Sequence, residues 1–272
     1  MRVAVGILSV IGVCHATWPA LVVRADGPGH GDAELRMRVL FDSTSGHAGW
    51  HTGWGYAALL QLGERTVLFD TGADGQALLS NLARAGVRPS EIDHVVLSHD
   101  HPDHAGGLAT LLQVSPHPEV HIPRGASIRT QQVVRAAGAR LTLVSRPTRI
   151  APRVHSTGPL GKRIPEQALV LTTETGLVVV AGCAHPGLER MLRAARRLHR
   201  RPIDTVAGGW HLLNASRQRI RRVIAALRRL DVRRVIPGHC TGRQMVRALR
   251  DAWGDAFIDG AVGRPLPFPL DR

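Results

Sequence analysis

The sequence predicts an α/β fold built as a single domain. From about Glu34 onward, short apolar strands alternate with amphipathic helices, and no internal repeat or low-complexity linker interrupts them. A length of 272 residues is enough for one sizeable core. With 44% hydrophobic and 21% charged residues, the composition excludes collagen-like, coiled-coil and wholly disordered chains. Three cysteines are too few for a disulfide scaffold.

The first half of the chain alternates short strands with helices. Apolar runs that stop at a turn, such as Thr66-Val-Leu-Phe69, are typical of buried strands. Apolar side chains at helical spacing, such as Leu78 and Leu82, indicate helices with one buried face. The expected strands are 36–41, 56–62, 66–69, 94–97, 120–122 and 141–144, and the expected helices are 76–85, 108–113 and 130–137.

The second half continues in the same style. The expected strands are 168–173, 177–180 and 235–239, and the expected helices are 188–201, 220–230 and 243–253. Short strands carried by helices favour an α/β architecture in which both sheet faces are partly covered. We therefore predict one domain over residues 34–272.

Arginine gives the chain its most unusual property. Lysine and arginine number 35 against 21 acidic residues, a formal net charge of +14, and Lys162 is the only lysine. A concentrated basic face attracts nucleic acid or an anionic membrane over long range. The densest run, 188–201, has its apolar residues at helical spacing, so its arginines fall on the opposite face. We interpret the excess as solvated helix faces and do not expect nucleic acid as the partner.

The N-terminal segment has the anatomy of a secretory signal. Arg2 precedes an apolar stretch from Val3 to Val13, and Ala16 and Ala25 offer small residues for cleavage. A membrane anchor over residues 1–25 and a mis-assigned start codon are the alternatives. The protein would be exported to the periplasm or membrane-anchored in the first two cases and cytoplasmic in the third. Contact with a membrane is expected only through this segment, if it is not cleaved.

The residues with the most chemistry stand together after the strand 94–97. The segment from Leu97 to Leu108 reads LSHDHPDHAGGL, with three histidines and two aspartates among six consecutive residues. His99 and His101 can point to one side of an extended turn, while Asp103 and His104 start the next helix and point to a neighbouring position. Imidazole and carboxylate together suit zinc or another first-row divalent ion. A hydrogen-bonded polar turn with surface histidines is the alternative.

Further histidines are needed if this loop serves two ions. His185 follows the apolar strand 177–180, His239 follows the strand 235–239, and His211 comes after a Gly-Gly-Trp segment. Each histidine is flanked by glycine, which lets the backbone approach a crowded centre. These three are therefore candidates for completing the site. Four other histidines have no such context and are interpreted as surface or packing residues: His30, His47, His117 and His199.

Several short motifs occur together along the chain. They are Phe69-Asp-Thr-Gly72, His99-x-His101-x-Asp103-His104, Gly182-Cys-Ala-His185, Gly208-Gly-Trp-His-Leu212 and His239-Cys-Thr-Gly242. The set resembles the metallo-β-lactamase superfamily of metal-dependent hydrolases, and its finer spelling resembles the dihydropterin ribofuranosylaminobenzene phosphate synthase-like subgroup. The match runs from about Arg36 to about Gly242. It implies an α/β fold of the four-layer αββα sandwich type, so that 34–272 is a metallo-β-lactamase-like hydrolase domain.

The resemblance also implies a division of the site residues. His99, His101 and His185 would bind one divalent ion, and Asp103, His104 and His239 would bind the other. Asp70 would orient a ligand histidine. Two zinc ions are expected, with manganese or iron as alternatives.

In two places this chain departs from the superfamily pattern. Many superfamily members carry a bridging aspartate where this chain has Cys183, and a further histidine where it offers only the displaced His155. Either Cys183 binds metal as a thiolate, or His185 covers the gap alone, or the second site is weak. We favour His185 as the ligand. The role of Cys183, as a thiolate ligand or as a neighbour that supports one, stays open.

The implied ions predict hydrolysis. Zinc can lower the pKa of a bound water to about 7, so hydroxide is available at neutral pH. Asp103 would orient that water as well as bind metal. His211 would donate a proton to the leaving group or bind a substrate oxygen, and a hydrogen-bonded loop histidine is the alternative for it.

The expected substrate is a small anionic phosphoester or ester. Arg163 and Glu166 lie in a loop that also carries charged residues in the subgroup. An arginine in this loop would suit binding of a phosphate or carboxylate group. Taken singly, both are interpreted as solvated loop charges. A nuclease of the same superfamily acting on RNA or DNA, and a non-catalytic metal-binding protein that keeps the fold, are the alternative functions.

Overall fold

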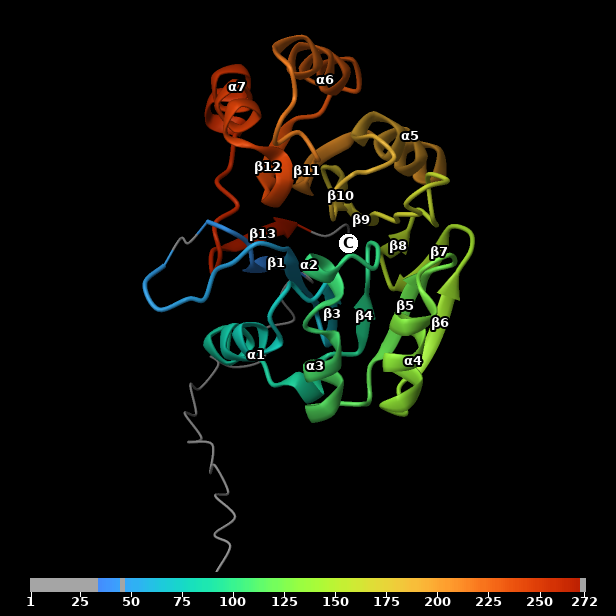
Figure 1. Ribbon diagram of the computed structural model, residues 1–272. Coiled ribbons are helices and arrows are strands. Elements are labelled where there is room, and N and C mark those ends of the chain that lie inside the picture. The colour runs from blue at the N-terminus through green and yellow to red at the C-terminus, as the bar shows by residue number, and fades with distance from the viewer. Residues whose placement is uncertain (1–33, 45–46, 270–272) are drawn as a thin grey trace, which may run out of the picture. The chain divides into compact units, whose positions relative to one another are not determined.

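Two β-sheets lie face to face, and helices cover both outer faces (Figure 1). The computed structural model describes residues 34–44 and 47–269, so the proposed signal or anchor over 1–25 lies outside the described residues. Within the described ranges, no helix combines the length and apolar character needed to cross a membrane. The predicted α/β class and its four αββα layers are confirmed.

The first sheet has seven strands in the order β13-β1-β2-β3-β4-β5-β6. Neighbours from β13 to β3 are antiparallel, and those from β3 to β6 are parallel. The strands are β1 (Glu34–Phe41), β2 (Ala57–Leu62), β3 (Arg65–Phe69), β4 (His94–Val96), β5 (Glu119–Pro123), β6 (Arg140–Val144) and β13 (Pro265–Pro269).

The second sheet has six strands in the order β12-β11-β10-β9-β8-β7. Strands β10, β11 and β12 are parallel, and the neighbours from β7 to β10 are antiparallel. The strands are β7 (Thr148–Ala151), β8 (Val154–Ser156), β9 (Leu169–Thr173), β10 (Gly176–Ala181), β11 (Ile203–Gly209) and β12 (Arg234–Gly238).

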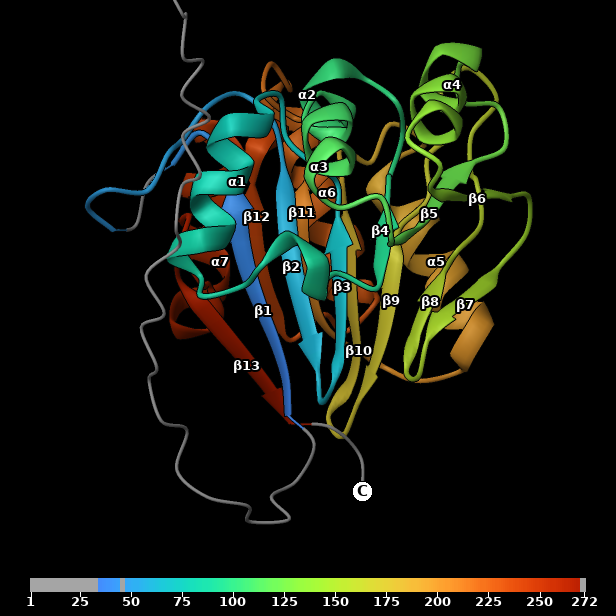
Figure 2. The same cartoon turned by 90° about the horizontal axis from the view of Figure 1, so that it is seen from below.

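Helices pack on each sheet through one apolar side. Helices α1, α3 and α4 cover the first sheet, and α5, α6 and α7 cover the second, as Figures 1 and 2 show. The α-helices are α1 (Gly75–Arg84), α2 (Pro102–Ala105), α3 (Leu108–Val114), α4 (Ile128–Ala136), α5 (Leu188–His199), α6 (Arg217–Arg229) and α7 (Arg243–Trp253). Short 3-10 turns are η1 (Pro89–Glu91), η2 (His239–Thr241) and η3 (Gly254–Ala256).

The core between the sheets follows from the alternation of side chains along each strand. In β10, Val178 and Val180 point into the space between the sheets, while Leu177 and Val179 pack under the helices. Because both faces of this strand are covered, its whole sequence GLVVVA is apolar. Burying each valine or leucine in this way stabilises the fold by about 1.5–3 kcal/mol.

The arginines of α5 and α6 lie on the solvent side. Arg193, Arg196, Arg221 and Arg222 are exposed, whereas the apolar faces of both helices are buried on the second sheet. The interpretation of the positive charge as solvated helix faces is confirmed for these two helices.

Four strands have no counterpart in the sequence prediction. Strand β13 reads Pro-Leu-Pro-Phe-Pro, and proline is tolerated there because β13 is an edge strand paired only with β1. Strand β11 contains an aspartate and ends in two glycines, which hides its apolar pattern. Strands β7 and β8 are only four and three residues long.

The loops that carry the predicted site leave the carboxyl ends of strands in both sheets. Asp70 follows β3, the segment from Ser98 to His104 follows β4, and Cys183 follows β10. Gly182 lets the two sheets approach here, because a Cβ at this position would lie 2.1 Å from Oγ of Ser98 and 3.0 Å from Oδ2 of Asp70. The sandwich therefore brings segments distant in sequence to one edge.

Candidate metal centre

Asp70 holds the histidine-rich loop in place. Its carboxylate accepts the backbone N–H of Ser98 (2.6 Å), the hydroxyl of Ser98 (2.8 Å) and Nδ1–H of His104 (2.7 Å), and all three residues are fully buried. The backbone of Asp70 has a positive φ of 58°, a conformation that aspartate tolerates better than most residues. With Nδ1 of His104 held as a donor, its Nε2 is left with a free lone pair.

The first cluster consists of His99, His101 and His185. Their ligand nitrogens lie within 4.8 Å of one another, and Nε2 of His99 is 3.2 Å from Nε2 of His185. Two nitrogens at about 2.0–2.1 Å from a tetrahedral zinc ion are separated by roughly 3.3–3.4 Å. The Ser98 hydroxyl contacts Nδ1 of His99 at 2.9 Å and so fixes this ring. Three imidazoles therefore converge at a spacing that fits one ion.

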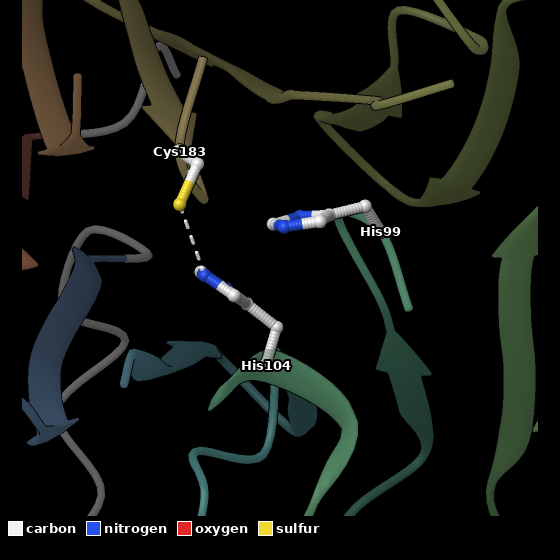
Figure 3. Close-up of side chains that lie close together, drawn as sticks. All are labelled: His99, His104 and Cys183. Atoms are coloured by element: carbon white, nitrogen blue, oxygen red, sulfur yellow. Dashed lines mark hydrogen bonds between the residues drawn. The ribbon is translucent and has the colours of Figure 1, made fainter. Parts of the chain in front are cut away.

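The second cluster joins both sheets. Nε2 of His104 lies 3.2 Å from Sγ of Cys183, and Oδ2 of Asp103 lies 3.2 Å from Nε2 of His239 and 3.7 Å from Nε2 of His104. Figure 3 shows His104 and Cys183 pointing toward each other, with His99 beside them. Both ring nitrogens of His239 are buried and make no hydrogen bond with the described residues. A buried imidazole without a hydrogen-bond partner, directed at a carboxylate, is an arrangement in which both groups could bind one cation.

Cys183 lies between the two clusters. It forms metal-compatible groups with His99 and His104, with His185 and His211, and with His239 and Cys240. Its Sγ is 3.3 Å from Sγ of Cys240, whose sulfur also accepts the backbone N–H of His211 at 3.2 Å. The contact between the two sulfurs lowers the pKa of Cys240, whereas the same contact and burial raise the pKa of Cys183.

Burial and neighbouring charges determine the protonation of the histidines. Burial lowers the pKa of His99 and lowers that of His185 to about 4, and nearby imidazoles act in the same direction. Both rings are therefore neutral at pH 7, as a metal ligand must be. Burial alone would lower the pKa of His239, but the carboxylate of Asp103 and the sulfur of Cys240 raise it to about 9. A divalent ion bound between Asp103 and His239 would take the place of this proton.

Glu166 fixes the loop that carries Cys183 and His185. Oε1 accepts the backbone N–H groups of Cys183 (2.9 Å) and Ala184 (2.8 Å), and Oε2 accepts that of His185 (2.8 Å). The side chain is fully buried, and this burial raises its pKa. The interpretation of Glu166 as a solvated loop charge is therefore wrong, because its carboxylate replaces water as the partner of three buried donors. Arg163, by contrast, is exposed as expected.

Asp42 performs a similar task for His239. Its Oδ2 accepts the backbone N–H of His239 at 2.7 Å, and its Oδ1 accepts that of Ser43 at 2.6 Å. Asp42 is 2% exposed, and burial raises its pKa. Sequence reasoning missed this residue, although an aspartate directly after the first strand is a signal that could have found it.

A pocket of about 510 Å³ opens over the clustered side chains. Its walls include Trp54, whose ring lies 4.6 Å from that of His239, and Arg219 at the start of α6. His211 also faces the pocket, and its exposed ring lies 4.4 Å from that of His185. The site is thus reachable by a small molecule and has one cationic wall.

Comparison with known proteins assigns the family. A profile of the metallo-beta-lactamase superfamily matches residues 55–239, which include the loops described above. The chain belongs to this superfamily. Its sequence is 27% identical over 250 residues to 7,8-dihydropterin-6-methyl-4-(beta-D-ribofuranosyl)-aminobenzene-5'-phosphate synthase of Methanocaldococcus jannaschii, covering 75% of this chain and 85% of that protein.

Solved structures of the metallo-β-lactamase superfamily agree with this assignment. A metal-dependent hydrolase of the superfamily superposes with a TM-score of 0.74 at 28% identity, covering 85% of this chain and 98% of that chain. The short form of human tRNase Z superposes with a TM-score of 0.59 at 13% identity, covering 86% of this chain and 100% of that chain. The second likeness concerns the fold alone.

The metallo-β-lactamase fold brings all the predicted site residues together. His99, His101 and His185 meet in one cluster, and Asp103, His104 and His239 meet beside it, with Asp70 behind His104 and Cys183 between the clusters. The displaced His155 lies on β8, where its ring packs against His199 of α5 at a centroid distance of 4.6 Å. His47 and His117 are exposed. His30 lies outside the described residues.

Proposed function

We propose that this superfamily member is a two-metal hydrolase of small anionic phosphoesters or esters. One ion would be held by His99, His101 and His185, and the other by Asp103, His104 and His239, with Cys183 between them. The convergence of these two clusters beneath a single pocket is the observation that carries the proposal. Imidazole, carboxylate and thiolate together favour zinc over magnesium or calcium.

Bound divalent ions supply acidified water and polarise a phosphoryl or carbonyl oxygen. The remaining steps fall to side chains of this chain. The Asp103 carboxylate, which lines the pocket, orients the attacking water. His211, exposed on the pocket wall, donates a proton to the leaving oxygen.

Arg219 and Trp54 would position the substrate. The guanidinium of Arg219 offers two parallel donors to a phosphate or carboxylate, and it is the only arginine among the residues described as lining this pocket. The Trp54 ring is 49% exposed and offers an apolar face for the organic part of the substrate. The Methanocaldococcus relative is named for a product with a 5'-phosphate, which favours a phosphoester among the substrate classes.

Turnover of chromogenic substrates by purified, metal-loaded protein tests the proposal. We expect hydrolysis of bis(p-nitrophenyl) phosphate, p-nitrophenyl phosphate or p-nitrophenyl acetate. His101→Ala should lose one metal equivalent relative to wild type and fall to the rate of metal-free protein. His117→Ala, which changes an exposed histidine outside the pocket, is the matched control.

Two outcomes would overturn the proposal in different ways. Absence of turnover on every substrate by zinc- or manganese-loaded protein would indicate a metal-binding protein that keeps the fold without catalysis. Faster cleavage of labelled RNA or DNA than of the chromogenic esters would indicate a nuclease. Replacing Arg219 by Gln separates binding from chemistry. If Arg219 contacts the substrate equally in the ground state and in the transition state, its loss raises KM and leaves kcat unchanged.

A further inference from the structure

A second group of potential metal ligands lies away from the clustered histidines of the candidate centre. His94 begins β4, and Glu119 and His121 lie on the neighbouring parallel strand β5. In the register of the sheet, His94 is paired with Glu119, and Val96 is paired with His121. The loop of the candidate centre leaves the other end of β4, beginning at Ser98. The group therefore lies at the amino end of the strand whose carboxyl end carries the site.

All three side chains point to the same face of the first sheet. Side chains alternate along a strand, and Val95 and Val120 pack under the outer helices. His94, Glu119 and His121 stand at the alternate positions and so face the side toward the second sheet, as Val96 does. The face of β4 and β5 that points away from the helices therefore carries three side chains capable of binding metal.

The ligand atoms converge to a spacing that fits one ion. Nδ1 of His94 lies 3.2 Å from Nε2 of His121, the same separation as between His99 and His185 in the candidate centre. Oε1 of Glu119 lies 3.9 Å from Nε2 of His121, and the ligand atoms of the group all lie within 4.8 Å of one another. A shift of Oε1 by about 0.5 Å toward His121 brings this distance to the roughly 3.3–3.4 Å expected between two ligands of a tetrahedral zinc ion.

The polar surroundings orient the ligands and keep the imidazoles neutral. The hydroxyl of Thr142 on β6 donates to Oε1 of Glu119 at 2.6 Å, and Nε of Arg140 lies 3.9 Å from the same oxygen. His121 is 3% exposed, and its Nδ1 has no hydrogen-bond partner among the described residues. The ring therefore makes its polar contact with His94 through Nε2. Burial lowers the pKa of His121 to about 4 and also lowers that of His94, which leaves both rings neutral at pH 7.

Solvent reaches this group from one side. His121 is buried, whereas the side chain of Glu119 is 22% exposed and His94 is half-buried. Two imidazoles and one carboxylate supply three ligands, which leaves a fourth position for water. Two arginines oppose a bound ion here. Arg65 is paired with Asp93 at 3.0 Å, and Arg140 is 79% exposed, so a partner carboxylate or water weakens the repulsion from each.

We propose that His94, Glu119 and His121 form a separate binding site for one first-row divalent cation, with zinc as the preferred ion. The bound ion joins β4 to β5 and so stabilises the strand that leads into the catalytic loop. The connection is direct, because the carbonyl of His121 accepts the backbone N–H of Leu97 at 3.0 Å, and Ser98 follows at once. The site does not depend on the proposed hydrolase activity.

Zinc stoichiometry of the full-length protein tests this site. Wild-type protein is dialysed against zinc chloride in the micromolar range and its zinc content per chain is measured. We expect His94→Asn and Glu119→Gln each to bind one zinc equivalent fewer than wild type, with any hydrolysis of the chromogenic esters unchanged from the wild-type rate. His117→Asn, an exposed histidine two residues before Glu119, should bind the wild-type amount.

A spectroscopic measurement keeps the test independent of folding defects. Cobalt substituted for zinc should give wild type an additional visible absorption from a tetrahedral site, and His94→Asn should lack it although its far-UV circular dichroism is unchanged. Equal zinc content and equal cobalt spectra for wild type, His94→Asn and Glu119→Gln would overturn the proposal. That result, together with metal loss in His101→Ala, would leave the two-metal centre standing, so the two proposals fail separately.

Discussion

Glu166 offers the sharpest test of how the site is built, because one buried carboxylate holds three backbone donors of the loop 182–187. In Glu166→Ala, the N–H groups of Cys183, Ala184 and His185 lose their acceptors at 2.9, 2.8 and 2.8 Å. In Glu166→Gln, the amide oxygen can keep the contacts of Oε1 with Cys183 and Ala184. The amide nitrogen then faces the N–H of His185, and two donors oppose each other.

The magnitudes follow from the number of donors left unsatisfied. A buried donor without an acceptor costs about 1–3 kcal/mol, so three of them amount to about 3–9 kcal/mol. Burial raises the pKa of Glu166, which means that desolvation of its charge already opposes folding, and its removal offsets part of this loss. We therefore expect Glu166→Ala to lower the free energy of unfolding by about 3–4 kcal/mol and Glu166→Gln by about 1–3 kcal/mol.

Urea unfolding of the metal-free proteins measures these differences, and zinc titration measures their effect on the site. Because the loop carries His185 and Cys183, we expect about 10–100-fold weaker zinc binding in Glu166→Gln. Glu64→Gln, an exposed acid in the turn between β2 and β3, is the charge-matched control. If Glu166→Ala unfolds within about 0.5 kcal/mol of wild type, the loop does not depend on this carboxylate and the reasoning fails.

Two further predictions concern individual histidines. If His211 donates the proton to the leaving group, His211→Asn should lower kcat by about 100-fold or more without changing metal content, whereas unchanged kcat would make it a plain loop residue. The pKa of His121 is lowered by burial from 6.5 to about 4, so between these pH values the unfolded chain binds more protons than the folded one. The free energy of unfolding of metal-free protein should therefore fall as pH falls from about 6.5 to 4. His121→Gln should flatten this dependence in urea unfolding, and an unchanged slope would contradict the assignment.

The candidate ligands are easier to recognise in the sequence than the side chains that hold their loops in place. The motif from His99 to His104 is dense enough in imidazole and carboxylate to be recognised without coordinates, and glycines mark the strand ends that deliver His185 and His239. Neither a dense histidine motif nor a glycine at a strand end points to Glu166 or Asp42 in the sequence. Each acts through the backbone of a residue distant in sequence, and a contact of Asp42 with His239 spans 197 positions. Local pattern does not encode partners at that separation.

The contrast between local sequence patterns and long-range partners also explains which strands could be predicted from the sequence. Strands with continuous apolar runs, such as β3 and β10, are visible because both of their faces are buried. Strand β13 is stabilised by pairing with β1, and its prolines are acceptable only at a sheet edge. The arginines of α5 and α6 were correctly predicted to lie on the solvent side, because the spacing of apolar residues along a helix is a local property of the sequence. The pairing of His94 with Glu119 across two strands was missed, because only the register reveals it.

Both sheets carry candidate ligands of the proposed centre, and this has a consequence for variants far from the pocket. His104 and Asp103 are attached to one half of the sandwich, and Cys183 and His239 to the other. Any movement of one sheet relative to the other would change the distances between these four side chains. Interior side chains such as Val180 and Ile236, which pack between the two sheets, therefore help to set the distances between these candidate ligands. We therefore expect substitutions between the two sheets to weaken metal binding at the proposed centre.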